Sequence, residues 1–289
     1  MTVYICRAKE YEKMTGTLQN KTKDRRARIR RGEPITESEL IFYPITMDYY
    51  EEYIHCKEAF ALRQASLPVR YLSMNWLSAL FTMELDAVKN GKPSAGLFYR
   101  VMLILHLSLR IGFNIDELNK NICIKEERGN IVLDYIVIKQ DDKIVKFTPL
   151  DFTTKFRPLI AEQNGLELPD ESENIDLVQD NDKLKEIARK GKPLNINLDD
   201  LIASVAYQSK LSEKDIMSWT VREFENRKKA IDRDKRYMLC GQGEMSGMVS
   251  FKNGNPSPSW CFDTLDNSLG TMEGSKLQKT LSGVAEQKK

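Results

Sequence analysis

A run of almost uninterrupted apolar residues between positions 101 and 109 restricts the fold more than any other part of the sequence. Arg100 and Arg110 bound this run, which is far shorter than the ~20 apolar residues that a membrane-spanning helix requires. A helix that is apolar on nearly every face needs other elements to cover it. We therefore predict a core helix over residues 97–111.

The segments around this helix predict a helical core that occupies residues 41–164. Apolar residues recur at helical spacing over residues 47–64, where aromatic side chains form a stripe, and over residues 71–88. A further helix is expected over residues 152–163. The helix over residues 71–88 should pack against the apolar run and complete the main core.

The hydrophobic period changes over residues 122–148, which predicts a small antiparallel β-meander. β-branched residues dominate this segment, and Gly129 with Asn130 and Asp141 with Asp142 mark two turns. A sheet of this size needs a covering layer. The predicted fold class is therefore α+β, predominantly helical, with a helical core covering the meander and a smaller C-terminal helical module with an extended arm.

Changes in composition divide the rest of the chain. At 289 residues with 41% hydrophobic content, the chain can bury one good core and a second small one. Residues 1–40 are expected to form an N-terminal strand and a basic arm. Acidic residues with few aromatics predict a linker over residues 165–197, and residues 264–289 have the composition of a flexible tail. The C-terminal module occupies residues 198–263.

Helix-start and helix-stop signals define the C-terminal module. Thr220 and Glu223 have the spacing of a reciprocal capping box, which predicts a helix that begins after Thr220. Gly241 and Gly243 are expected to end this helix, and residues 245–251 then predict a short extended run. This arm either contacts another protein or folds back over its own helices. The candidate protein-binding residues are Met245, Met248, Phe251, Trp260 and Phe262.

Lys and Arg fill seven of the positions from 21 to 31, which predicts a basic loop or arm. A solvated surface stretch, binding to phosphate groups and docking on an acidic protein face are all compatible with this run. No aromatic residue interleaves it, which disfavours stacking on single-stranded nucleic acid. The candidate anion-binding residues are Arg25, Arg26, Arg28 and Arg30.

The overall charge and the cysteines restrict the class of protein. The chain has 44 basic and 42 acidic residues, so its net charge of +2 creates no general attraction to nucleic acid or membranes. Its five cysteines are scattered singly, which favours reduced thiols inside a cell.

Residues that could support catalysis are few. The chain has only two histidines, His55 and His106, although general-base and nucleophilic catalysis commonly recruit this residue. His55 and Cys56 are neighbours in a helical pattern and cannot face the same way. The glycines of GQGEMSG follow a helix and precede an extended run, the reverse of their order in a phosphate-binding loop. We predict a protein that is not an enzyme and has no catalytic, cofactor or metal site.

The second half of the chain contains a series of distinctive segments. They are DFTTKFRPLIAEQNGLELPDE from Asp151, LDDLIASVAY from Leu198, DIMSWTVREFENR from Asp215, and the pieces SGMVSFK from Ser246 and SW from Ser259. In this order they resemble a family of proteins encoded in the structural gene modules of tailed bacteriophages. Ser259 stands where the family pattern has histidine. The resemblance is to the tail-assembly-chaperone-like class, which holds aggregation-prone tail components during assembly.

This resemblance implies a non-catalytic protein-binding factor of tailed-phage morphogenesis, either a tail-assembly chaperone or a tail-associated structural component. The implied partners are other phage structural proteins, such as the tail tube or tape-measure protein. Neither a membrane nor nucleic acid is expected as a partner. The implied location is the host cytoplasm during assembly, or the virion.

The alternative function is a nucleic-acid-binding regulator with a helix-turn-helix at about residues 199–230. In this hypothesis Ser212 opens the recognition helix, and Arg222 and Arg227 lie beyond it. Glu213 and Asp215 occupy the first turn of that helix and would repel DNA. The acidic turn favours the protein-binding hypothesis over the regulator.

Overall fold

The computed structural model describes residues 23–171, apart from 128, and residues 197–262, apart from 248, 249 and 252–254. The chain falls into two compact units. Unit 1 comprises Met1–Pro169 and Leu198–Lys228, and unit 2 comprises Asp170–Asn197 and Lys229–Lys289. Most of the predicted linker and all of the predicted tail lie outside the described residues.

Unit 1 combines a small sheet with a larger set of helices, which confirms the predicted α+β, predominantly helical fold class. The sheet consists of β3 (Ile122–Glu127), β4 (Asn130–Gln140) and β5 (Lys143–Phe147), and both strand pairs are antiparallel. The strand order β3-β4-β5 follows the chain, so the predicted meander is confirmed.

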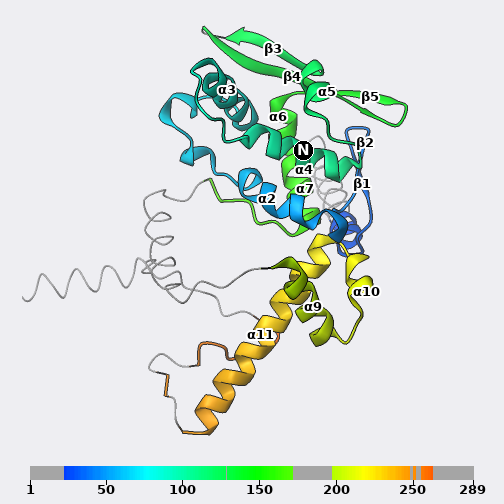
Figure 1. The fold of residues 1–289 in the computed structure, drawn as a ribbon, viewed down its shortest axis with the longest axis vertical. Helices are drawn as coiled ribbons and strands as arrows, with labels where there is room; N and C mark the ends of the chain where they lie inside the picture. The colour runs from blue at the N-terminus through cyan, green and yellow to red at the C-terminus, as the bar shows by residue number, and fades with distance from the viewer. Residues whose placement is uncertain (1–22, 128, 172–196, 248–249, 252–254, 263–289) are drawn as a thin grey trace, which may run out of the picture. The chain divides into compact units, whose positions relative to one another are not determined.

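Three helices contribute many of the buried side chains of unit 1 (Figure 1). They are α2 (Tyr50–Phe60), α3 (Trp76–Lys89) and α4 (Leu97–Leu109). α4 is buried along most of its length, with Phe98 and Leu105 fully inaccessible, because its sequence is apolar on most faces. The predicted core helix is therefore confirmed.

Two hydroxyl side chains of α3 attach this helix to the sheet. The Ser78 hydroxyl donates to the Leu133 carbonyl oxygen at 3.4 Å, and the Thr82 hydroxyl donates to the Ile131 carbonyl oxygen at 3.2 Å. Figure 1 shows α3 beside β3 and β4. The helical cover that a small sheet requires is thus present on this side of the meander.

A continuous helical segment follows the sheet. It consists of α6 (Pro149–Asp151), the π-helical η4 (Phe152–Phe156) and α7 (Arg157–Asn164), which confirms the helix predicted over this region. Thr148 begins it with a capping box to the Asp151 side chain. Gly165 ends it in the left-handed conformation with φ +66°.

Backbone hydrogen bonds join the start of α11 (Val221–Met245) to the segment before α2. The Val221 N–H donates to the Ile45 carbonyl oxygen at 2.8 Å, and the Met47 N–H donates to the Trp219 carbonyl oxygen at 3.0 Å. These bonds connect two segments that are far apart in the sequence. They make the start of α11 part of unit 1.

The domain division differs from the predicted one at this point. α9 (Leu198–Ser209) and α10 (Glu213–Met217) belong to unit 1, whereas the sequence suggested an independent module over residues 198–263. Burial explains the difference, because Val221 and Phe224 are 0% exposed and cannot leave the core without a large cost.

Amide side chains hold the chain between β2 (Leu40–Phe42) and α2. Gln140 accepts a hydrogen bond from the Ile41 N–H at 2.8 Å and donates to the Ile41 carbonyl oxygen at 2.9 Å. Asn164 accepts a hydrogen bond from the Ile45 N–H at 2.8 Å. Buried backbone groups outside a ladder need such partners, so these amides fix the position of the whole segment.

The basic run is helical over residues 23–30, which corrects the predicted loop or arm. Ile29 is 3% exposed and anchors this helix to unit 1. One buried residue among arginines is a weak apolar signal in the sequence. β1 (Ile35–Glu37) follows and pairs antiparallel with β2. The strand expected at the very beginning of the chain lies outside the described residues.

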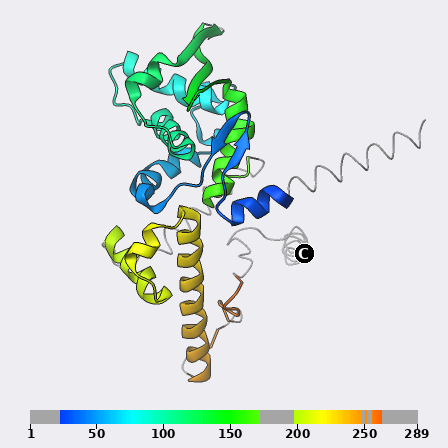
Figure 2. The same ribbon diagram turned by 90° about the vertical axis from the view of Figure 1, so that its right-hand side faces the viewer.

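α11 continues through Gly241 and Gly243 and ends at Met245, which corrects the predicted helix end (Figure 2). Each glycine costs an interior helix only ~1 kcal/mol, and the Leu, Gln, Glu and Met residues around them favour helix. Gly247, with φ +69°, lies in the turn that follows. Met245 is helical and residues 246 and 247 form a turn, so the start of the expected extended run is also corrected, whereas positions 248 and 249 of that run lie outside the described residues.

Candidate functional site

α11 is anchored at its start and becomes progressively exposed. The Thr220 N–H donates to the Glu223 carboxylate at 2.8 Å, and the Glu223 N–H donates to the Thr220 hydroxyl at 3.2 Å, which confirms the predicted capping box. Val221 and Phe224 are the buried residues of the helix. From Glu225 to its end, α11 therefore has no fully buried side chain, although it carries several large apolar ones.

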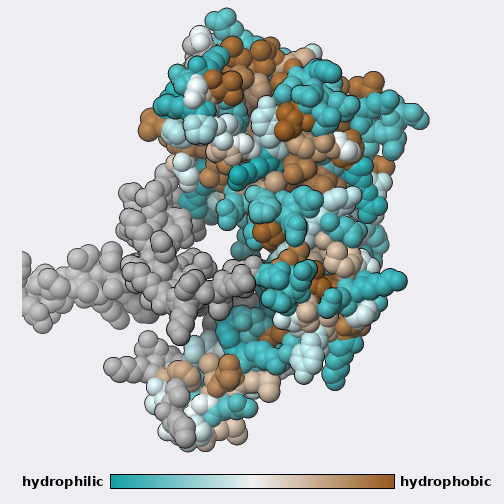
Figure 3. Space-filling view, in the orientation of Figure 1, coloured by the Kyte–Doolittle hydropathy of each residue, from teal (hydrophilic) through white to brown (hydrophobic). Residues whose placement is uncertain are grey.

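Among the described residues of unit 2, six large apolar side chains are open to solvent. Met245 is 91% exposed, Phe262 is 76% exposed and Trp260 is 62% exposed. Figure 3 shows apolar side chains at the surface near the C-terminal end of α11. We call this group the apolar α11 surface, and its members are Tyr237, Met238, Leu239, Met245, Trp260 and Phe262.

Polar contacts hold residues 255–262 against α11 and leave their aromatic side chains exposed. The Arg233 guanidinium donates to the Cys261 carbonyl oxygen at 3.0 Å, and the Asn255 amide donates to the Glu244 carboxylate at 2.8 Å. In Figure 2 this segment lies beside the C-terminal half of the helix. The Arg233 contact holds the backbone at Cys261, which lies between Trp260 and Phe262 in the sequence.

The structure places three of the predicted protein-binding residues at the surface of unit 2. Met245, Trp260 and Phe262 are members of the apolar α11 surface, Phe251 is half-buried, and Met248 lies outside the described residues. Tyr237, Met238 and Leu239 were missed as surface residues. A signal was present, because three consecutive large apolar residues on a helix cannot all face one core.

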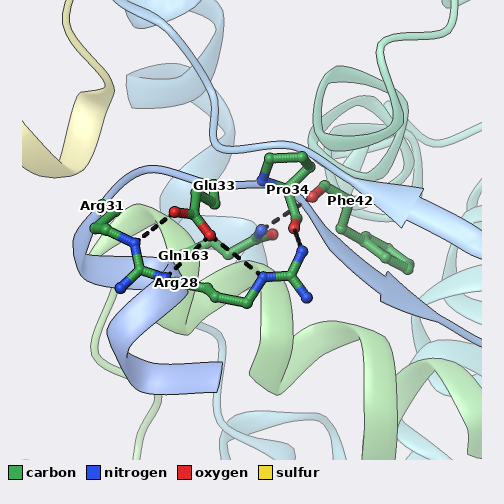
Figure 4. Close-up of polar contacts among 6 residues, drawn as sticks. All are labelled: Arg28, Arg31, Glu33, Pro34, Phe42 and Gln163. Carbon is green, nitrogen blue, oxygen red and sulfur yellow. Dashed lines mark hydrogen bonds and ion pairs between the residues drawn. The ribbon is translucent and has the colours of Figure 1, made fainter. Parts of the chain in front are cut away.

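The predicted anion-binding arginines do not act as one group. Arg25 pairs with Glu162 at 3.3 Å, and Arg28 donates to the Pro34 carbonyl oxygen at 2.6 Å and pairs with Glu33 at 3.4 Å. Figure 4 shows Arg28 and Arg31 converging on the Glu33 carboxylate. Arg26 and Arg30 are exposed. Two of the four candidates therefore stabilise unit 1 through contacts within the chain.

Ion pairs between Glu33 and two arginines hold the end of this basic helix in place (Figure 4). Glu33 approaches Arg28 and Arg31, while the Gln163 amide donates to the Phe42 carbonyl oxygen at 3.0 Å. The Arg31 guanidinium next to Glu33 lowers the pKa of this carboxyl and keeps it charged. The local chemistry is that of an ion-paired helix end.

A buried tyrosine and a carboxylate link α2 to α11. The Tyr50 hydroxyl donates to the Glu225 carboxylate at 2.5 Å, and burial followed by this hydrogen bond raises the pKa of Tyr50. Burial alone would raise the pKa of Glu225, but hydrogen bonds from Lys228 and Tyr50 bring it below its ordinary value. The carboxylate therefore stays charged, and the contact stabilises the junction.

The two histidines and Cys56 differ in burial and in their surroundings. His55 is exposed, whereas the adjacent Cys56 is buried and burial raises the pKa of its thiol. His106 is 8% exposed, with Nδ1 2.7 Å from the Met102 carbonyl oxygen, and burial lowers the pKa of its imidazole. Within the described residues, no three His, Cys, Asp or Glu side chains are grouped to hold a metal ion.

α10 contains only five residues, Glu213–Met217. Ser212 and Asp215 form its capping box, so Asp215 is held at the helix start by the Ser212 hydroxyl and N–H. Ile216 is 0% exposed. A recognition helix opened by Ser212 would thus have one turn and a carboxylate at its N-terminus.

No protein-family model, curated protein or solved structure matches the chain. Across the described residues, every helix is too short or too polar to cross a membrane.

Proposed function

We propose that this protein is a non-catalytic protein-binding factor of tailed-phage morphogenesis, acting as a tail-assembly chaperone or a tail-associated structural component. The assignment to phage morphogenesis rests on the resemblance of the segments from Asp151, Leu198 and Asp215 to proteins of phage structural gene modules. The assignment to protein binding rests on the apolar α11 surface.

The apolar α11 surface supports protein binding through its chemistry. Exposed apolar side chains in excess of those scattered singly over a surface mark interaction sites, and Trp and Tyr are enriched among the residues that dominate binding energy. Met238 and Met245 add adaptable side chains that fit irregular partner surfaces. Such a mixture suits a factor that holds apolar segments of another protein before they assemble.

The geometry of residues 255–262 strengthens this proposal. The Arg233 guanidinium holds the backbone carbonyl of Cys261, between Trp260 and Phe262, so part of the entropy cost of ordering these two residues is already met. A segment that served only as a cover would bury these rings. Their exposed fractions of 62% and 76% favour a role in binding a partner.

Co-purification with tail proteins tests the proposal. The tail tube and tape-measure proteins of the same genome would each be co-expressed with the wild type and with the double variant Trp260→Ala, Phe262→Ala. We expect at least one of the two proteins to co-purify with the wild type and to be lost with the double variant, because central aromatic contacts commonly contribute ~2 kcal/mol or more each.

Tyr207→Ala is the matched control, because Tyr207 is an 81% exposed aromatic residue on α9, outside the apolar α11 surface. This variant should co-purify the same protein as the wild type. Circular dichroism would establish that each variant is folded. Failure of the wild type to bind either protein, or equal recovery by the wild type and the folded double variant, would contradict the proposal.

A further inference from the structure

One face of α3 opens into a cavity of about 400 Å³ within unit 1. Phe81, Glu84, Leu85 and Val88 line it from α3, at the spacing that places residues on one side of a helix. The volume lies at the lower end of the range for small-molecule sites. The cavity is separate from the apolar α11 surface, whose residues all belong to unit 2.

The opposite walls of the cavity combine apolar and polar groups. Ile122 and Ile124 of β3 contribute apolar surface, while Ser94, Tyr99 and Asn119 contribute oxygen and nitrogen atoms. The Tyr99 hydroxyl donates to Asn119 Oδ1 at 3.2 Å, which connects the start of α4 to α5 (Ile115–Lys120). Apolar walls with a few placed polar groups are typical of ligand sites.

Glu84 is the unusual residue of this cavity. It is 7% exposed, and its Oε2 atom is buried without a hydrogen-bond partner among the described residues. A buried carboxylate normally has a paired cation or several hydrogen-bond donors, because leaving it alone costs free energy. A satisfied buried charge in unit 1 illustrates the usual arrangement: Arg157 donates to the Phe60 and Leu62 carbonyl oxygens at 3.1 Å and 2.8 Å.

The position of Glu84 within α3 is also unfavourable for a residue that only fills the core. Leu77, Leu80 and Phe81 precede it along the buried side of the helix, and an apolar residue at position 84 would continue that surface. A carboxylate there weakens packing, and its Oε2 atom gains no hydrogen bond from the described residues. Groups that oppose stability in this way are found at functional sites.

We propose that this cavity binds a small organic cation that joins a primary ammonium group to an apolar body. The ammonium group would donate to the Glu84 carboxylate, and Asn119 and Ser94 contribute further oxygen acceptors to the lining of the cavity. The apolar body would lie against Phe81 and Ile122. Charge complementarity excludes an anion, and a single carboxylate provides too few oxygen ligands for calcium or magnesium.

Titration of the full-length protein with benzylamine, which is cationic at neutral pH, tests this proposal. Benzyl alcohol and benzoate serve as neutral and anionic probes of similar shape, and binding is measured by calorimetry and by the shift in melting temperature. We expect benzylamine to bind the wild type and to raise its melting temperature. Benzyl alcohol should bind more weakly by roughly tenfold or more, and benzoate should not bind.

Glu84→Gln removes the charge and keeps the shape, so its affinity for benzylamine should fall by roughly tenfold or more. Glu126→Gln is the matched control, because Glu126 is an exposed carboxylate on β3 that does not line the cavity. Should Glu84→Gln fail to fold, Val88→Trp provides a second test. Val88 is 71% exposed, and a tryptophan there would obstruct the cavity and abolish binding.

Three results would overturn the proposal. The first is that the wild type does not bind benzylamine. The second is that it binds benzylamine and benzyl alcohol with equal affinity. Unchanged benzylamine affinity in folded Glu84→Gln or Val88→Trp would place any binding elsewhere. Because these measurements do not involve Trp260 or Phe262, their outcome is independent of the proposed role in phage assembly.

Discussion

At the scale of single residues, two leucines of α4 look equivalent in the sequence but differ in how deeply they are buried. Leu105 is 0% exposed, whereas Leu103 is half-buried beside a surface cavity. Leu105→Ala should therefore lower the free energy of unfolding by ~2–5 kcal/mol, because it leaves a cavity in a packed core. Leu103→Ala should cost clearly less, since water can replace the lost side chain.

Urea denaturation of both leucine variants measures this difference. A loss below ~0.5 kcal/mol for Leu105→Ala would contradict the position of α4 at the centre of the core. Equal losses for the two variants would contradict the difference in burial between them.

Asp151 makes a second residue-scale prediction, which concerns pH. Hydrogen bonds from Lys155 and then Thr148 lower the pKa of its carboxyl from 3.8 to about 2. Because the folded-state pKa is the lower one, the stabilising contribution is complete above the unfolded pKa and disappears as the pH falls through about 2. The Asp151 side chain is 33% exposed, and solvent weakens its ion pair with Lys155. We therefore expect it to contribute at most ~1 kcal/mol to the free energy of unfolding.

Asp151→Asn should flatten the dependence of unfolding free energy on pH in this acidic window. Urea denaturation at a series of pH values measures the slope. Asp142→Asn, which changes an exposed carboxylate in the turn between β4 and β5, is the control for the loss of one negative charge. Identical slopes for Asp151→Asn and wild type would show that the capping box does not hold the carboxylate charged.

At the scale of elements, local patterns predicted helices and strands well where the apolar period was strong. The meander and the helix of α4 are examples, because each places its apolar residues on the surfaces that the fold buries. The helix over residues 23–30 was missed, since Ile29 alone supplies its buried surface. The end of α11 was misplaced because a glycine stop signal depends on whether the backbone leaves the helical conformation.

Gly241 and Gly165 therefore provide a matched pair of glycine substitutions. Gly241 lies inside α11, and a Cβ atom there would meet nothing within 4 Å. Gly241→Ala should stabilise the helix by ~0.5–1 kcal/mol. Gly165 has φ +66°, and a Cβ atom would lie 3.3 Å from Arg222 Cγ, so Gly165→Ala should destabilise unit 1.

Hydrogen exchange of the α11 amides is the suitable measurement for Gly241→Ala, because an exposed helix can open without unfolding of unit 1. Protection should rise around position 241. Reduced protection would mean that the helix is not continuous through this glycine. For Gly165→Ala, thermal denaturation should show a lower melting temperature than the wild type.

At the scale of the whole molecule, the sequence did not reveal which segments meet. The bonds from Val221 to Ile45 and from Tyr50 to Glu225 connect residues with no local signal for each other. The same limit applies to the candidate sites. The aromatic and sulfur-rich composition of residues 245–262 predicted part of the apolar α11 surface. The cavity beside Glu84 could not be predicted in this way, because residues of β3 and α5, which are distant in the sequence, form its other walls.

The distribution of charge over the molecule makes the last prediction. Arg25 and Arg28, half of the predicted anion-binding group, pair with Glu162 and Glu33, and the net charge of the chain is only +2. Phosphate contacts release few counterions from such a surface, so we expect no measurable binding of duplex DNA at physiological salt. A gel shift with wild-type protein and with the Arg26→Ala, Arg30→Ala variant tests this expectation. A wild-type shift with roughly submicromolar affinity, lost in the variant, would favour the regulator over the assembly factor.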